Sequence, residues 1–134
     1  ILLATQVAAG EENNLNIRIY GEKGGLEWRQ EEPNTLILKW LDKPKEILRA
    51  GWKYLSTETN SYFRTPPGHP EGYLEAFANI YRSFTNAFRD YKPGKKINAE
   101  KYDFPDVHHG VRGMNFVETV VKSAGSNKKW VKIK

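Results

Sequence analysis

The sequence predicts an α+β fold, with a mainly antiparallel sheet that is covered on one face by helices. Four short segments between residues 15 and 49 alternate apolar and polar side chains, which is typical of strands. Two later segments, after Pro70 and after Asp106, repeat apolar side chains at steps of three and four, which is typical of helices. Neighbouring strands with short links favour antiparallel pairing over alternating βαβ units.

Composition limits the classes of protein to which this chain can belong. Its 134 residues suit a single domain, residues 1–134, and 39% hydrophobic residues allow a core. The formal net charge is +5, but the basic residues are scattered along the chain, which argues against a nucleic-acid partner. The absence of cysteine excludes disulfides and thiolate chemistry, and no apolar run is long enough for a membrane helix. We therefore expect a cytoplasmic protein with no membrane partner.

The predicted strands follow one another closely in the first third of the chain. We expect strands over residues 1–9, 15–20, 26–29, 35–41 and 46–49. The segment GEKGG, residues 21–25, is glycine-rich, and glycine tolerates positive φ, so a tight hairpin is expected there. Leu36, Leu38 and Trp40 share one face of the 35–41 strand, whereas Ile37 and Leu41 lie on the other, so this strand is expected to be covered on both sides. Because an apolar strand pattern starts at the first residue, we expect the chain to be a fragment.

The two predicted helices are separated from the strands by a long loop. Residues 50–67 form this loop, which carries the aromatic residues Trp52, Tyr54, Tyr62 and Phe63. The first helix is expected after Pro70, which occupies a favoured first position, with Glu71 in its first turn facing the positive end of the helix dipole. The second is expected over residues 107–124, capped by Asp106 and stopped by Gly125. Residues 129–134 alternate imperfectly and are interpreted as a terminal strand.

Familiar catalytic and cofactor motifs are missing from the sequence. The dense glycine cluster joins two predicted strands rather than a strand and a helix, so it is not a dinucleotide-binding turn, and no GK[ST] phosphate loop occurs. His108 and His109 are adjacent and point in different directions, while His69 is distant in sequence, so no metal site is expected. Ser, His and Asp occur without a nucleophile elbow, so the residues also predict no catalytic triad.

His69, Glu71 and Tyr73 are the candidate substrate-binding residues. They occupy the turn before the first predicted helix, where unpaired backbone amides face polar groups. Helix capping and packing explain Glu71 and Tyr73 without any ligand, and a surface or capping role explains His69. Both the structural and the binding interpretation remain open at this point.

Three longer stretches resemble the last part of oxidoreductases of the Gfo/Idh/MocA family. They are residues 6–36, residues 65–84 with TPPGHPEGYLEAFANIYRSF, and residues 110–133 with GVRGMNFVETVVKSAGSNKKWVKI. They follow the family order and cover most of the chain. The family often has an acidic residue directly before the glycine that corresponds to Gly110, whereas here three residues separate Asp106 from Gly110, so we assign no functional role to that turn.

The resemblance implies a two-domain parent enzyme, an NAD- or NADP-dependent dehydrogenase or reductase of a sugar, cyclitol or related polyol. The N-terminal Rossmann domain of such an enzyme would be absent here, together with its catalytic lysine in an EKP-type motif; Glu22 and Lys23 lie in GEKGG and do not replace that motif. The resemblance thus implies a C-terminal portion that contributes the substrate pocket and a homo-oligomer interface through the sheet face. It holds no catalytic residue and binds no cofactor, so we expect it to be inactive alone. The alternative is an autonomous, non-enzymatic binding or assembly module that binds carbohydrate through the loop aromatics.

Overall fold

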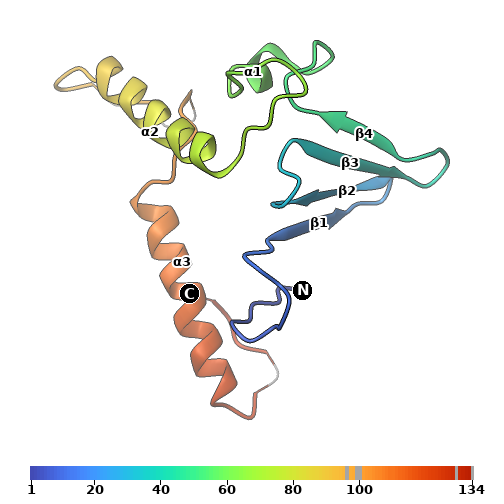
Figure 1. Cartoon of the computed structure of the whole chain (residues 1–134). Coiled ribbons are helices and arrows are strands. Elements are labelled where there is room, and N and C mark those ends of the chain that lie inside the picture. The colour runs from blue at the N-terminus through green and yellow to red at the C-terminus, as the bar shows by residue number, and fades with distance from the viewer. Residues whose placement is uncertain (96, 99–100, 129, 134) are drawn as a thin grey trace. The chain divides into compact units, whose positions relative to one another are not determined.

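Four strands form one antiparallel sheet in the order β1-β2-β3-β4 (Figure 1). Their bounds are β1 Asn16–Tyr20, β2 Gly24–Arg29, β3 Thr35–Trp40 and β4 Glu46–Arg49. The computed structural model describes residues 1–95, 97–98, 101–128 and 130–133. It divides into two compact units, Ile1–Asn79 and Ile80–Lys134, and the sheet belongs to the first. The predicted α+β class with an antiparallel sheet is confirmed.

The β1–β2 hairpin forms at the predicted glycine cluster, but for a different reason. None of the glycines of GEKGG has a positive φ. Instead, a Cβ atom on Gly24 would lie 2.5 Å from the Lys39 carbonyl oxygen, and one on Gly25 would lie 2.7 Å from the Ile19 carbonyl oxygen. Glycine is required here because the neighbouring strands approach too closely for a side chain.

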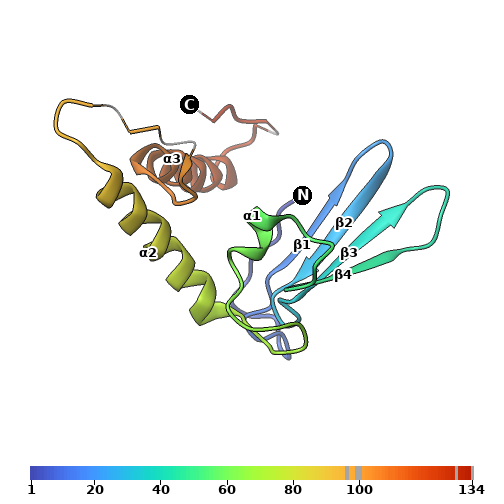
Figure 2. The same cartoon turned by 90° about the horizontal axis from the view of Figure 1, so that it is seen from above.

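The register gives the sheet two unlike faces, and the strands lie side by side in both views (Figure 2). Residues that pair directly share a face. One face is apolar, with Ile17, Ile19, Leu26, Trp28, Leu36, Leu38, Trp40 and Leu48. The other carries Arg18, Glu27, Lys39, Ile37 and Ile47. Leu41, predicted on this second face, lies beyond the end of β3 and is exposed.

A charge cluster occupies the polar face. The buried Glu27 carboxylate pairs with Arg29 at 2.8 Å, with Arg18 at 3.6 Å and with Lys39. Hydrogen bonds from Lys39 and then Arg29 lower the pKa of Glu27 from 4.5 to about 2, although burial acts in the opposite direction. The carboxylate therefore stays ionised and ties β1, β2 and β3 together.

The helices depart from the prediction at one end only. The long loop contains one helical turn, α1 (Thr57–Asn60), and the next helix, α2, spans Tyr73–Asp90. The prediction that Pro70 and Glu71 belong to α2 is wrong. Gly72 starts the helix, because its carbonyl accepts the Ala76 N–H at 2.9 Å and its own N–H donates to the Glu75 carboxylate at 2.9 Å. Glu75, three residues into the helix, thus fills the role expected of Glu71.

The second unit contains the rest of α2 and α3 (Val107–Ala124), whose predicted bounds are confirmed. The Asp106 carboxylate accepts the N–H groups of His108 and His109 at 2.9 and 3.0 Å, and Gly125 follows as the predicted C-cap. These contacts supply the partners that a helix end lacks within the helix itself.

Two predicted strands at the ends of the chain are absent from the described residues. Residues 1–9 form no strand, and residues 130–133 form none either; Lys129 and Lys134 lie outside the described residues. Apolar alternation alone does not make a strand, because the backbone also needs a neighbouring strand with which to pair. Ile1, Leu2 and Leu3 are accordingly exposed.

Little apolar surface is buried. Ala87 is the buried hydrophobic residue among those described, whereas Phe77 and Phe84 of α2 and Val117 of α3 are about half exposed. Within the first unit, the strands contact one another and α1 packs against none of them. The covering of one sheet face by helices therefore stays a prediction.

Candidate functional site

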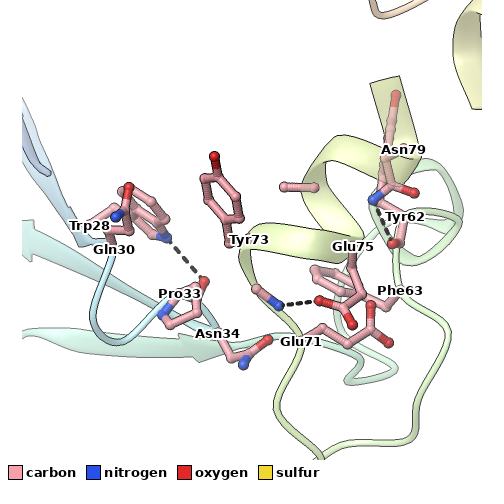
Figure 3. Close-up of a pocket in the computed structure, with 12 residues that line it drawn as sticks. Trp28, Gln30, Pro33, Asn34, Tyr62, Phe63, Glu71, Tyr73, Glu75 and Asn79 are labelled. Carbon is pink, nitrogen blue, oxygen red and sulfur yellow. Dashed lines mark hydrogen bonds between the residues drawn. The ribbon is translucent and has the colours of Figure 1, made fainter. Parts of the chain in front are cut away.

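A cavity of about 380 Å³ lies within the first unit, where the end of the β2–β3 hairpin meets the loop before α2 (Figure 3). It is lined by Trp28, Gln30, Pro33, Asn34, Tyr62, Phe63, Glu71, Gly72, Tyr73, Glu75, Ala76 and Asn79. Aromatic rings and carboxylates thus come together from three segments that are far apart in the sequence. Such a combination of apolar walls and a few polar groups is typical of small-molecule sites.

Short-range contacts hold the aromatic walls. The Trp28 indole N–H donates to the Pro33 carbonyl at 3.0 Å, which fixes the ring against the β2–β3 turn. The Tyr73 ring packs on Phe77 with ring centroids 4.8 Å apart, at the first turn of α2. Tyr73 is largely exposed and its ring stands between Trp28 and the start of the helix (Figure 3). A ligand in the cavity would therefore meet ring faces as well as polar atoms.

Glu71 is the most buried polar residue of the site, with 8% of its surface exposed. Its Oε1 accepts the backbone N–H of Arg64 at 2.6 Å, the backbone N–H of Thr65 at 2.5 Å and the Thr65 hydroxyl at 2.8 Å. Its Oε2 is buried and accepts no hydrogen bond from the described residues; the nearest cation is Arg64 Nη1, at 4.0 Å. One oxygen therefore clamps the loop, while the other is buried and accepts no hydrogen bond from the described residues.

Asn79 forms a second clamp on the same loop. Its amide Nδ2 donates to the Tyr62 carbonyl at 3.0 Å, and its Oδ1 accepts from Arg64 Nη2 at 2.8 Å. The loop residues Tyr62 and Phe63 are thereby held against the start of α2, where they form one wall of the cavity. The wall is set by hydrogen bonds from both Glu71 and Asn79.

Both carboxylates of the site remain ionised at neutral pH. Burial raises the pKa of Glu71, but the hydrogen bonds from Thr65 and Arg64 together outweigh burial, so its pKa lies below the ordinary value. The pKa of Glu75 is also lowered, mainly by the Gly72 N–H, although burial and the neighbouring Glu71 charge oppose that shift. The cavity therefore presents two negative charges.

The three predicted substrate-binding residues are not all together. Glu71 and Tyr73 line the cavity, whereas His69 lines a neighbouring depression of about 320 Å³ that also includes Glu32 and Arg49. The His69 backbone N–H donates to the Pro66 carbonyl at 3.2 Å, and its Nδ1 lies 3.2 Å from the same oxygen. The substrate-binding role of all three residues stays a prediction.

The sequence did not indicate that Trp28, Gln30 and Asn79 belong to the site. Trp28 lies in the predicted strand 26–29 and Asn79 in the helix predicted after Pro70, and only the tertiary fold brings them together. Of the loop aromatics, Tyr62 and Phe63 line the cavity, whereas Trp52 and Tyr54 stack on each other with centroids 6.2 Å apart. The aromatic residues of the 50–67 loop, which include Tyr62 and Phe63, were the sequence feature that could have indicated this cavity.

Metal-binding clusters and membrane-spanning helices are absent from the described residues. No group of three potential metal ligands occurs in that part of the chain, and none of its helices is long and apolar enough to cross a membrane. The GEKGG glycines join two antiparallel strands, so their backbone amides do not form the strand-to-helix turn that holds a dinucleotide pyrophosphate. The GEKGG segment therefore does not fit an NAD or NADP pyrophosphate site.

Comparison with known proteins identifies relatives across the whole chain. Residues 2–133 match the family described as oxidoreductase family, C-terminal alpha/beta domain. The chain is 32% identical over 130 residues to an uncharacterized oxidoreductase, YfiI, of Bacillus subtilis (strain 168). This match covers 97% of the present chain and 33% of the Bacillus protein.

Two solved structures extend the comparison to the fold. An oxidoreductase from Sinorhizobium meliloti is 41% identical, with a TM-score of 0.83, over 96% of this chain and 35% of that one. An inositol dehydrogenase homolog from Azotobacter vinelandii, complexed with NADH and myo-inositol, is 34% identical, with a TM-score of 0.83, over 94% of this chain and 33% of that one. The chain thus spans about a third of the length of these relatives.

Proposed function

The chain belongs to the Gfo/Idh/MocA oxidoreductase family through its C-terminal alpha/beta domain, and we propose that it forms the substrate-pocket part of an NAD- or NADP-dependent dehydrogenase or reductase. The substrate class is a sugar, a cyclitol or a related polyol, and the compartment is the cytoplasm. The observation that carries the proposal is the aromatic cavity with the unpartnered Glu71 oxygen. Likeness to a myo-inositol complex at 34% identity supports the same substrate class.

The cavity has the chemistry that a polyol ring requires. The buried Glu71 Oε2 is an acceptor without a donor, and an ionised carboxylate accepts hydroxyl hydrogen bonds that are stronger than neutral ones. The Tyr73 and Trp28 rings offer faces on which the C–H side of a sugar or cyclitol packs. In this proposal Glu71 orients a ring hydroxyl, Tyr73 packs on the ring, and His69 contacts the substrate from the neighbouring depression.

The cofactor belongs to a separate N-terminal Rossmann domain of the longer protein. NAD or NADP supplies the hydride acceptor or donor there, whereas this chain binds and orients the substrate and excludes water from it. The chain by itself should neither bind NADH nor turn over substrate. Isothermal titration calorimetry checks this expectation, and saturable NADH binding by the purified chain would refute it.

The second proposed role is a homo-oligomer contact through the sheet. Ile37 and Ile47 pair across β3 and β4 on the polar face and give that face an apolar centre. Sedimentation velocity over a range of concentrations should show self-association, and Ile37→Asp should weaken it because the aspartate places a charge in the contact. A chain that stays strictly monomeric at high concentration would contradict the oligomer proposal without affecting the substrate proposal.

The competing function is an autonomous carbohydrate-binding module. The observation that favours it is the stacked Trp52–Tyr54 pair, about half exposed, which presents a ring platform away from the cavity residues. Glycan binding that is lost in Trp52→Ala but kept in Tyr73→Ala would support this module. Polyol binding with the opposite pattern supports the substrate pocket.

A further inference from the structure

The cavity combines two facing carboxylates with no positively charged lining residue. Figure 3 shows the Glu71 and Glu75 side chains pointing toward each other below the first turn of α2. The residues that line the cavity include these two acids and no Lys, Arg or His. The local charge is therefore negative, although the whole chain carries a formal charge of +5.

Internal contacts leave part of this negative charge without a hydrogen-bonded donor among the described residues. The side chain of Glu71 is only 6% exposed, and its Oε2 has no hydrogen-bond partner among the described residues. Arg64 lies 4.0 Å away from that oxygen at Nη1, and its other nitrogen, Nη2, is bound to Asn79. The Glu75 carboxylate accepts the neutral Gly72 N–H, and the Arg64 charge lowers its pKa less than that hydrogen bond does. Arg64 therefore offsets at most one of the two charges.

We propose that the ligand of this cavity carries hydroxyl or ammonium donors and no acidic group. An aminated sugar should bind more tightly than its neutral parent, and the neutral parent more tightly than its acid. The reason is that an ionised carboxylate only accepts hydrogen bonds, so it attracts an ammonium group and repels a second anion at short range. This inference rests on the proposed polyol site and specifies which polyols that site accepts.

The test uses three matched ligands and the purified chain. Glucose, glucosamine and glucuronate share one ring and differ in charge, and myo-inositol serves as the neutral cyclitol reference. Calorimetry or saturation-transfer NMR should rank glucosamine above glucose and glucose above glucuronate, by about tenfold at each step for one charge interaction in a partly buried site. Glucuronate binding as tightly as glucose would overturn the inference and leave the polyol site intact. Failure of every ligand, myo-inositol included, would overturn the polyol site and the inference together.

Variants that remove one negative charge test whether Glu71 and Glu75 cause the expected order of sugar affinities. Glu75→Gln should reduce the advantage of glucosamine and the disadvantage of glucuronate, and Glu71→Gln should do so less strongly, because Arg64 lies 4.0 Å from the buried Glu71 Oε2. Glu118→Gln is the matched control, because Glu118 is an exposed acid on α3 that pairs with Lys122 at 3.8 Å. An unchanged ranking in the folded Glu75→Gln protein would overturn the assignment, even if Glu71→Gln fails to fold.

Discussion

Glu71→Ala should release the loop that forms one wall of the cavity. The substitution removes the acceptor of three donors, the N–H groups of Arg64 and Thr65 and the Thr65 hydroxyl, at 2.5 to 2.8 Å. Hydrogen bonds to a charged group contribute about 1.5–3 kcal/mol each, but water reaches the freed donors once the loop opens. We therefore expect a loss of about 3 kcal/mol in unfolding free energy, at the upper end of ordinary substitutions.

Two measurements check this expectation. Urea denaturation gives the change in unfolding free energy, and amide hydrogen exchange reports on the Arg64 and Thr65 N–H groups directly. Glu71→Gln keeps one side-chain oxygen as an acceptor and loses the charge, so we expect an intermediate cost of about 1 kcal/mol and partial protection of both amides. Glu75→Ala is the matched control, because the Glu75 carboxylate accepts the Gly72 N–H, whereas the Arg64 and Thr65 N–H groups donate to Glu71.

The pH dependence of the clamp has a definite sign. The pKa of Glu71 is lowered in the folded protein relative to its ordinary value of 4.5. The stabilisation is therefore fully present above that value and is lost as the pH falls through the folded pKa. Unchanged exchange of the Arg64 and Thr65 amides in Glu71→Ala at neutral pH would refute the clamp.

Three further substitutions test the sheet and α3 separately. Glu27→Gln should lower the urea midpoint at neutral pH, because Arg18, Arg29 and Lys39 lose their shared anion. Since the pKa of Glu27 is about 2, the stabilisation by the carboxylate should persist above pH 4.5 and disappear as the pH approaches 2. Equal urea midpoints for the wild-type and Glu27→Gln proteins at neutral pH would contradict this. Gly24→Ala should lower the unfolding free energy measured in urea by about 1–3 kcal/mol, because its Cβ would meet the Lys39 carbonyl oxygen at 2.5 Å. Gly21→Ala should be tolerated, because the nearest atom to its Cβ would lie at 3.5 Å. Equal stabilities of the two variants would be inconsistent with this steric argument. Asp106→Ala should reduce helicity by circular dichroism, because the His108 and His109 N–H groups lose their acceptor, and Asp106→Asn should retain more of it; unchanged ellipticity in Asp106→Ala would speak against the cap.

Local pattern predicted the strands and α3 because their determinants are local. The alternation of Leu26 with Glu27 and of Leu36 with Ile37 follows the pleat, and each pair lies on opposite faces as expected. Asp106 and Gly125 define the ends of α3 through contacts within a few residues. The sequence pattern therefore predicts an element correctly where the residues that define it lie within that element or next to it.

The prediction failed where the deciding partner lies elsewhere. Residues 1–9 have the pattern of a strand but no neighbouring strand, so the pattern was not enough. Glu71 was placed in the first turn of α2 because acids favour that position. The structure instead uses Glu75 at the helix start and turns Glu71 toward Arg64 and Thr65, a contact that no propensity rule contains. Trp28 and Tyr73 meet in one cavity only after the loop has folded.

Glu71 also explains why a stabilising residue and a binding residue can be the same side chain. Burying a carboxylate costs folding free energy unless its oxygens are hydrogen-bonded. Among the described residues, three donors bind Glu71 Oε1 and none binds Oε2. In the proposed function a ligand hydroxyl or ammonium group would supply the donor that Oε2 lacks among the described residues, so ligand binding and loop order should be coupled. Glu71→Gln should then lower the free energy of polyol binding by more than it lowers the free energy of unfolding. A loss of stability with no loss of polyol binding would indicate that Glu71 serves the fold alone.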